Sequence, residues 1–146
     1  IASGKILSGF HILRAMALGA DGCNSARAMM MALGCIQALL CNTNRCPTGI
    51  TTQDPQLTVG LVVEDKKHRV ANYHEDTVKS FVELLGAAGL EDMKQLTRSH
   101  IYRRVFMNEV RTFEDVFPSL QPGCLLNGNI PEKYKQDIEA ASADRW

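Results

Sequence analysis

Charged side chains are distributed very unevenly along this chain. The first 60 residues hold six of the 16 basic and 16 acidic side chains, and the following 86 residues hold the other 26. Because charged groups are rarely buried unless they are paired, the charge-poor part is expected to form the inside of a fold and the charge-rich part its outside. We therefore divide the chain into residues 1–61 and a charged, mainly helical extension over residues 62–146.

The overall composition excludes several classes of protein. Hydrophobic residues make up 45% of the chain and charged residues 22%, which is typical of a folded globular protein. The basic and acidic side chains cancel, so no net charge would attract nucleic acid or an anionic membrane. The longest mainly apolar run, residues 28–40, has 13 residues, whereas about 20 are needed to cross a bilayer. We expect neither a nucleic-acid partner nor a membrane span.

The N-terminal residues and the cysteine count indicate the cellular compartment. Residues 1–18 lack the unbroken apolar region and the small-residue cleavage site of a signal peptide. Without a secretory signal, five cysteines indicate metal or redox chemistry rather than a disulfide framework. We expect a cytoplasmic protein and, because translation does not start at Ile, a piece of a longer one.

The first half of the sequence predicts two successive strand-turn-helix units. An apolar pair runs into a Gly turn at residues 1–4, and Ser8 is placed to cap a helix that ends at Gly19. A second strand end is expected over residues 20–24 and a second helix over residues 25–40, apolar on every side and hence fully buried. Such units with short links predict an α/β fold with parallel strands.

The second half predicts mainly helix. We expect an ordered loop over residues 42–53 and a charged surface link over residues 64–69. An amphipathic helix over residues 75–88 and a helical turn over residues 91–96 should follow. A terminal helix that starts at a proline is expected over residues 131–143. Residues 101–110 fit a helix or a strand equally well. Thr112 and Asp115 have the spacing of a capping box, and Pro118 closes the turn that follows.

Three cysteines, Cys35, Cys41 and Cys46, form the pattern C-x5-C-x4-C, followed directly by Pro47. Six residues of helix rotate by about 600°, so the first two thiols would point about 240° apart unless the helix ends near Leu40. The turn-forming residues that follow allow a tight wrap whose N–H groups point inward.

Three thiolates without a nearby fourth ligand suit an iron–sulfur cluster with three irons better than zinc, which normally takes four ligands. Two alternatives remain open on spacing alone. The cysteines could be small buried hydrophobes, or His68 or His74 could complete a zinc site.

Four motifs together resemble the C-terminal part of the FMN-binding domain of glutamate synthase and its close relatives; they span residues 17–21, 32–35, 41–49 and 52–54. The resemblance is dense from Ser3 to Leu61 and thinner to about Leu90. It implies an α/β fold in which this chain forms about the last two strand-helix units of a (β/α)8 TIM barrel. An iron–sulfur loop and a helical tail would follow these units. It also implies two cofactors, FMN and a 3Fe-4S cluster held by the three cysteines of the C-x5-C-x4-C pattern.

The same resemblance implies that two turns bind the flavin phosphate, because such barrels place phosphate in the loops after strands seven and eight. The first turn is Ser3, Gly4 and Lys5, and the second runs from Asn24 through Ser25 and Ala26 to Arg27. Both depart from the usual family pattern, which has an acidic residue and a second Gly in the first turn and a Gly-rich turn with Thr in the second. The departures resemble the shorter branch of the family, which lacks the amidotransferase domain.

The resemblance implies a fragment of an FMN- and iron–sulfur-dependent oxidoreductase that forms glutamate reductively from 2-oxoglutarate and ammonia. No nucleophile with a paired base and no carboxylate pair is evident, so no catalytic residue is assigned. The alternative is a non-catalytic iron–sulfur or metal-stabilised electron-transfer or interaction module. A second enzymatic alternative is an FMN barrel of the 2-hydroxy acid oxidase kind. The cysteine loop argues against it, because such an oxidase has no reason to carry the C-x5-C-x4-C pattern.

The expected partners follow from the same resemblance and from the exposed helix. They are the missing remainder of the barrel and an electron-donating reductase subunit or ferredoxin. The isolated chain is expected to self-associate, because the predicted helix over residues 26–40 lacks its barrel neighbours.

Overall fold

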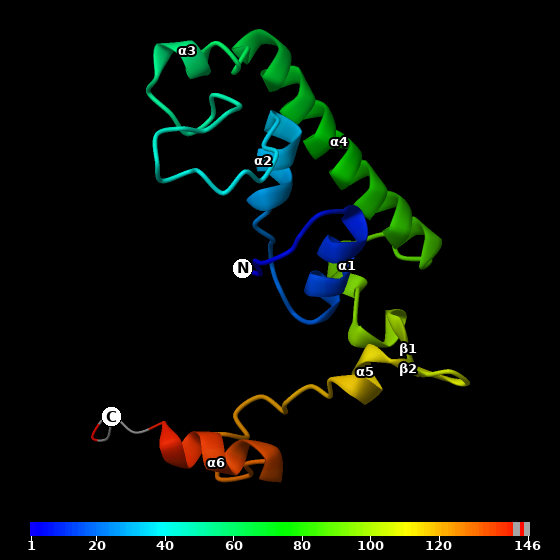
Figure 1. Ribbon diagram of the computed structural model, residues 1–146. Coiled ribbons are helices and arrows are strands. Elements are labelled where there is room, and N and C mark those ends of the chain that lie inside the picture. The colour runs from blue at the N-terminus through cyan, green and yellow to red at the C-terminus, as the bar shows by residue number, and fades with distance from the viewer. Residues whose placement is uncertain (142–143, 145–146) are drawn as a thin grey trace.

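The computed structural model describes residues 1–141 and 144. Figure 1 shows a body built from the first helices and the long α4, with a small hairpin below it and a C-terminal arm that leads away. The elements, in chain order, are α1 Gly9–Ala17, α2 Arg27–Leu33, α3 Pro55–Thr58, α4 Val63–Ala87, the 3-10 helices η1 Met93–Gln95 and η2 Arg98–His100, the strands β1 Tyr102–Phe106 and β2 Glu109–Thr112, α5 Phe113–Val116, and α6 Glu132–Ala140.

The two expected strand ends lie side by side and run parallel. Ala2 and Cys23 form an isolated parallel bridge, in which the Ala2 N–H donates to the Gly22 carbonyl and the Asn24 N–H donates to the Ala2 carbonyl, each at 2.8 Å. This agrees with a partial α/β unit. The complete TIM barrel stays a prediction, because within the described residues this single bridge is all the parallel pairing there is.

Helix α1 forms where the sequence predicts it. Ser8 is the N-cap residue, although its hydroxyl bonds to the His11 ring at 3.1 Å rather than to a backbone N–H. Leu18 caps the C-terminal end, and Gly19 follows with a φ of +107°, a left-handed conformation that favours glycine. Leu13 and Ala17 are buried on its inner face.

The prediction for the second helix is wrong in length and burial. Helix α2 ends at Leu33 instead of Leu40, because Gly34 adopts a φ of +114° and the Cys35 N–H bonds back to the Met30 carbonyl at 2.9 Å. The apolar pattern continues past this glycine into irregular chain. Within α2 only Ala28 is buried and Met31 is 38% exposed, so the helix is not enclosed on every side.

Helix α4 is longer than predicted, with 25 residues. The charged stretch over residues 64–69 is its first part rather than a surface link; Glu64 and Asp65 lie in the first turn, where negative charge favours a helix, and Lys67 pairs with Glu64. The predicted amphipathic helix over residues 75–88 is the second part of the same element. Helix α4 packs against both α1 and α2, and so becomes the support for the body (Figure 1).

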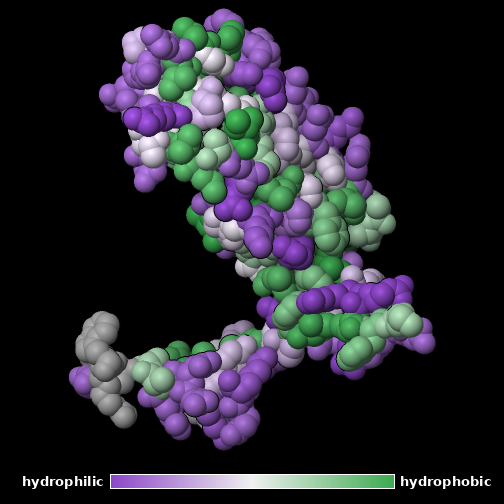
Figure 2. All heavy atoms as spheres, viewed as in Figure 1, coloured by the Kyte–Doolittle hydropathy of each residue, from purple (hydrophilic) through white to green (hydrophobic). Residues whose placement is uncertain are grey.

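One core cluster joins the body to the segment that follows it. Its members come from α1, from the C-terminal end of α4, from the residues that end η1 and η2, and from the start of α5. In chain order they are Leu13, Ala17, Leu85, Leu96, Ile101 and Phe113. The Arg98 guanidinium reinforces the join, because it donates both to the Leu18 carbonyl at 3.2 Å and to the Phe117 carbonyl at 2.5 Å. Figure 2 shows hydrophobic residues that also reach the visible surface of the body.

The C-terminal segment resolves the ambiguous stretch as a hairpin. Strands β1 and β2 pair antiparallel with a bulge between Arg104 and Phe106, so residues 101–110 are strand and turn. The helical turn at residues 91–96 and the Thr112–Asp115 capping box are confirmed. Helix α6 confirms a terminal helix, with Pro131 as its N-cap; residues 142–143 of the predicted helix lie outside the described residues.

None of the helices that the structure describes combines the length and the apolar character needed to cross a membrane.

The packing of α1 on α4 depends on Gly9. A Cβ atom at this position would lie 2.5 Å from the backbone nitrogen of Phe81 and 2.8 Å from the backbone carbon of Ser80. We expect Gly9→Ala to lower the free energy of unfolding by about 1–3 kcal/mol, since backbone atoms cannot move aside cheaply. The measurement is thermal or urea unfolding of the purified chain.

Gly86→Ala is the matched control, because it adds the same methyl group to a helix where no atom lies within 4 Å. It is expected to raise stability by about 0.5–1 kcal/mol. Equal stability of the two variants would contradict the close approach of α1 and α4.

Candidate cofactor-binding site

The two turns predicted to bind phosphate and two of the three cysteines of the pattern line a single hollow. Its volume is about 610 Å3. The lining residues are Ser3, Gly4, Lys5, Ile6, Leu7, Asn24, Ala26, Arg27, Met30, Cys35, Gln37, Leu39 and Cys41. Segments that lie up to 38 positions apart in the sequence therefore border one hollow.

The first turn opens into the hollow through left-handed backbone. Gly4 has a φ of +92° and Lys5 a φ of +56°, and no atom lies within 4 Å of the place where a Cβ on Gly4 would be. A non-glycine residue in this region costs about 1–2 kcal/mol. Backbone held in this way leaves room for a ligand to approach the main chain closely.

The second turn is tied to the first. The Ser25 hydroxyl donates to the Ile6 carbonyl at 2.7 Å, and the parallel bridge holds Asn24 beside Ala2. Ser25 therefore positions the turn, and is absent from the lining of the hollow. Arg27, the first residue of α2, is exposed and lines the hollow, with its charge available to an anion.

The cysteine-bearing loop leaves α2 and forms part of the lining of the hollow. The Gln37 N–H donates to the Cys35 sulfur at 3.4 Å, and Gln37 itself has a φ of +56°. Cys41 is exposed and lines both this hollow and a smaller one of about 390 Å3. Asn44 takes a φ of +61°, a left-handed conformation that asparagine tolerates and that fits the tight turn expected here.

Side-chain hydrogen bonds close the loop over residues 42–53. The Thr43 hydroxyl donates to the Leu40 carbonyl at 2.8 Å. The Thr52 hydroxyl donates to the Asn44 carbonyl at 2.6 Å, and the Asn44 side chain accepts from the Gln53 N–H at 2.7 Å. The prediction of an ordered loop here is confirmed.

Gly49 anchors this loop to α3. It is buried with a φ of +76°, and a Cβ there would lie 2.4 Å from the Leu57 carbonyl oxygen. Helix α3 begins because the Asp54 side chain accepts from the Gln56 N–H at 2.9 Å. The sequence predictions do not include this anchor; the Asp-Pro pair at residues 54 and 55 is the signal that could have shown it.

Cys46 has an unusually acidic thiol. Its sulfur lies 3.3 Å from the Thr48 hydroxyl. Hydrogen bonding from the Thr48 hydroxyl, and then from the backbone of Thr51 and of Thr48, lowers the pKa of Cys46 to about 6. The Thr51 hydroxyl oxygen is buried without a hydrogen-bond partner, so the hydroxyl in contact with the sulfur is that of Thr48. These threonines were missed in the sequence, where a Thr two residues after the Cys is the available signal.

The three cysteines are free thiols, and they are not arranged as a ready metal centre. Within the described part of the chain, no group of three His, Cys, Asp or Glu side chains is placed to hold a metal ion. Cys41 shares the larger hollow with Cys35 and lines the smaller one with Thr51, whereas Cys46 lines neither of the two.

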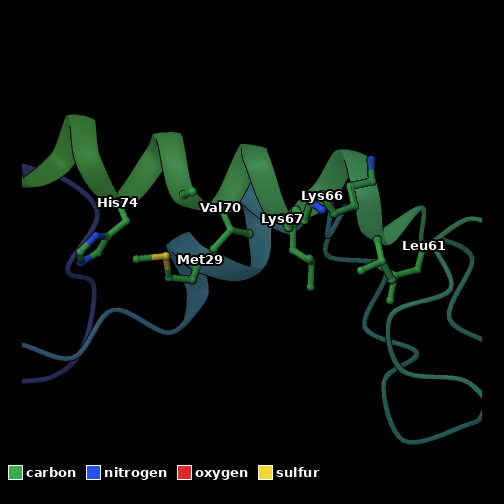
Figure 3. A pocket seen from close by; sticks show the side chains of 9 residues that line it. Met29, Leu61, Lys66, Lys67, Val70 and His74 are labelled. Carbon is green, nitrogen blue, oxygen red and sulfur yellow. The ribbon is translucent and has the colours of Figure 1, made fainter.

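A further hollow of about 580 Å3 lies between α2 and α4. Figure 3 shows Met29 of α2 beneath Val70 of α4, with Lys66 and Lys67 at one end and His74 at the other. No cysteine lines it, and neither His68 nor His74 lines the two hollows that Cys41 borders. The structure thus places the candidate zinc-completing histidines apart from the thiols.

Comparison with known proteins gives a consistent result. A family model described as the conserved region in glutamate synthase matches residues 1–91. The glutamate synthase large subunit-like protein YerD of Bacillus subtilis is 46% identical over 103 residues, which is 70% of this chain and 20% of that protein. The archaeal glutamate synthase (NADPH) of Methanocaldococcus jannaschii is 42% identical over 96 residues, 66% of this chain and 19% of that protein.

A more distant match extends further along the chain. The glutamate synthase (NADH) of Saccharomyces cerevisiae is 26% identical over 138 residues, 92% of this chain and 6% of that protein. The chain spans about a fifth of the length of the two more similar relatives. No solved structure matches it.

The acidic thiol gives a pH-dependent prediction. Because the pKa of Cys46 is lowered to about 6, its reactive thiolate should be present above that pH and be protonated below it. In the metal-free chain, the rate of alkylation of Cys46 should reach half its plateau near pH 6. Thr48→Val removes the main hydrogen bond, so the midpoint should move to higher pH.

Trypsin makes the measurement specific, because cleavage at Arg27, Arg45 and Lys66 puts Cys46 in a peptide separate from Cys35 and Cys41. Thr43→Val, which removes a hydroxyl that bonds to backbone in the same loop, is the control and should leave the midpoint in place. An unchanged midpoint in Thr48→Val would rule out the hydrogen bond as the cause.

Proposed function

Because this chain belongs to the glutamate synthase family, we propose that it supplies the last part of an oxidoreductase site in which FMN and a 3Fe-4S cluster lie side by side. One observation carries the proposal: both predicted phosphate-binding turns and two of the three pattern cysteines line the same hollow. Its volume falls within the range of about 300–1,000 Å3 that is usual for small-molecule sites.

The donor set of the two turns fits a flavin phosphate. Lys5 and Arg27 bring two positive charges to the hollow, and the exposed residues Ser3, Gly4 and Ala26 also line it. Arg in particular offers paired N–H donors to phosphate oxygens. We assign these residues to the phosphate, with Ser25 holding the second turn in place through the Ile6 carbonyl. When bound, FMN supplies the electron-transferring ring.

The loop fits a thiolate-held cluster. Cys35, Cys41 and Cys46 are unpaired thiols that are exposed or half-buried, and one of them is already acidic. The Gln37 N–H, which donates to the Cys35 sulfur, is the kind of donor that stabilises cluster sulfur. We assign the three cysteines as the ligands, with the loop closing round the metal as they bind.

The proposed reaction of the whole protein is reductive formation of glutamate. The relatives are named glutamate synthases or glutamate synthase-like proteins. Condensation of 2-oxoglutarate with ammonia releases water and gives an imine, which takes up two electrons and two protons to become glutamate. No residue of this chain is assigned to that chemistry; its own residues bind the phosphate and hold the cluster.

The proposed partners follow from apolar side chains of the cysteine-bearing loop that are exposed in this chain. Ile36 is 66% exposed and Leu39 83% exposed in the cysteine-bearing loop, where water would not favour them. We propose that the preceding part of the barrel covers these side chains and that the chain alone self-associates through them. A reductase subunit or ferredoxin would then deliver electrons to the cluster.

The phosphate assignment predicts a loss of flavin affinity. In the full-length protein, Arg27→Ala should raise the dissociation constant of FMN at least about tenfold, because a hydrogen bond to a charged group contributes about 1.5–3 kcal/mol. Equilibrium titration of the flavin-free protein measures this. Arg69→Ala, an exposed arginine of α4 outside the hollow, is the control and should bind FMN normally.

The cluster assignment predicts iron and sulfide in protein expressed and purified without oxygen. The ratio should approach three irons and four sulfides per chain, and Cys41→Ser should lose most of both. Cys23→Ser removes a thiol outside the pattern and should retain them. One zinc per chain and no sulfide would overturn the assignment, and a cluster without flavin would favour an electron-transfer module instead.

A further inference from the structure

Cys46 differs from the other cysteines in its neighbours. Of the thiols that the structure describes, it alone has a side-chain hydroxyl within hydrogen-bond distance, that of Thr48 at 3.3 Å. Cys35 receives a backbone N–H from Gln37. Almost any residue at position 37 would supply the backbone N–H that Cys35 receives. The hydroxyl beside Cys46, in contrast, is present only because residue 48 is a threonine.

Thr51 brings a second hydroxyl to the same loop, beside Cys41. Its oxygen is buried and lacks a hydrogen-bond partner, the one such side-chain atom among the described residues. A buried polar group that is left unpaired destabilises a fold, so a native structure that keeps one needs a reason. Thr51 lines the smaller hollow together with Cys41, so its side chain lies near one of the three thiols of the pattern.

The other threonine hydroxyls of the loop are already used. Thr43 donates to the Leu40 carbonyl, and Thr52 donates to the Asn44 carbonyl while accepting from the Asp54 N–H. Their hydrogen bonds hold the backbone of the loop. Thr48 and Thr51 are thus the two hydroxyls in the loop that are free to serve a sulfur atom.

We propose that Thr48 is a positioning residue whose hydroxyl donates to the Cys46 sulfur, that the unpaired Thr51 hydroxyl donates to a sulfur atom of the same centre, and that both raise the reduction potential of the cluster. The inference rests on the proposed function, because it requires Cys46 to be a cluster ligand. In the free thiol, either the sulfur or the Thr48 oxygen could be the donor. A metal-bound thiolate has no proton, so the hydroxyl must be the donor.

The direction of the effect follows from charge. One-electron reduction adds a negative charge to the cluster and its sulfur ligands. Hydrogen bonds that point at those sulfurs stabilise the more negative form to a greater extent, and such bonds are among the determinants of iron–sulfur potentials. Inside a protein the effect is strengthened by the low local dielectric. Loss of either hydroxyl should therefore make the potential more negative.

The test is a redox titration of the full-length holoprotein at one fixed pH, with dithionite as the electron source and the cluster followed by electron paramagnetic resonance. Thr48→Val and Thr51→Val keep the shape of the side chain and remove the hydroxyl. Each should shift the midpoint potential to more negative values. Thr48→Ser and Thr51→Ser keep the hydroxyl and should restore the midpoint to that of the unaltered protein.

Thr43→Val is the control, since it removes a loop hydroxyl that serves only backbone, and its midpoint should not move. If Thr48→Val fails to retain iron, Thr48→Ala provides the same comparison with a smaller side chain. A retained cluster with an unmoved midpoint in the Thr48 and Thr51 variants overturns this inference alone. Absence of a cluster from the unaltered protein overturns the proposed function and this inference with it.

Discussion

The packing of α1 and α2 along one side of α4 is the constraint on which the rest of the structure depends. At Gly9 the backbones of α1 and α4 approach so closely that a single methyl group would collide with main-chain atoms. Because α1 follows the first turn and α2 follows the second, fixing both helices on α4 also fixes both turns. The parallel bridge between Ala2 and Cys23 then sets the spacing of the turns, and the hollow results.

The cysteine-bearing loop is held by a different kind of interaction. Few of its side chains are buried; hydrogen bonds from Thr43, Thr52 and Asn44 hold its path, and Gly49 seats it on α3. A loop held in this way can keep an overall course while its thiols adjust. That property suits a segment in which two of the three cysteines line neighbouring hollows and the described residues form no preset metal centre. Metal binding would supply the remaining order, as it does in many small metal-binding segments.

The parts of the fold that could be predicted are those set by local signals. Ser8 and Gly19 bound α1, and the Thr112–Asp115 capping box opens α5, because the groups that start and end a helix lie within a few residues of each other. The same reasoning failed at α2, where the apolar pattern continues beyond Gly34 and concealed the C-terminal end of the helix. It failed again at residues 64–69, because a charged run does not distinguish an exposed helix face from a link.

The sequence by itself determined the candidate ligands and the family to which the chain belongs. The spacing of Cys35, Cys41 and Cys46 and the two turns depends on residue type and order, which a sequence states completely. Only the tertiary structure decided that both turns and two cysteines share one hollow, and that the Cys46 sulfur lies beside the Thr48 hydroxyl. These are distances between segments that hydrophobic packing and backbone hydrogen bonds bring together. No local pattern encodes them, because each depends on how helices far apart in the chain pack against α4.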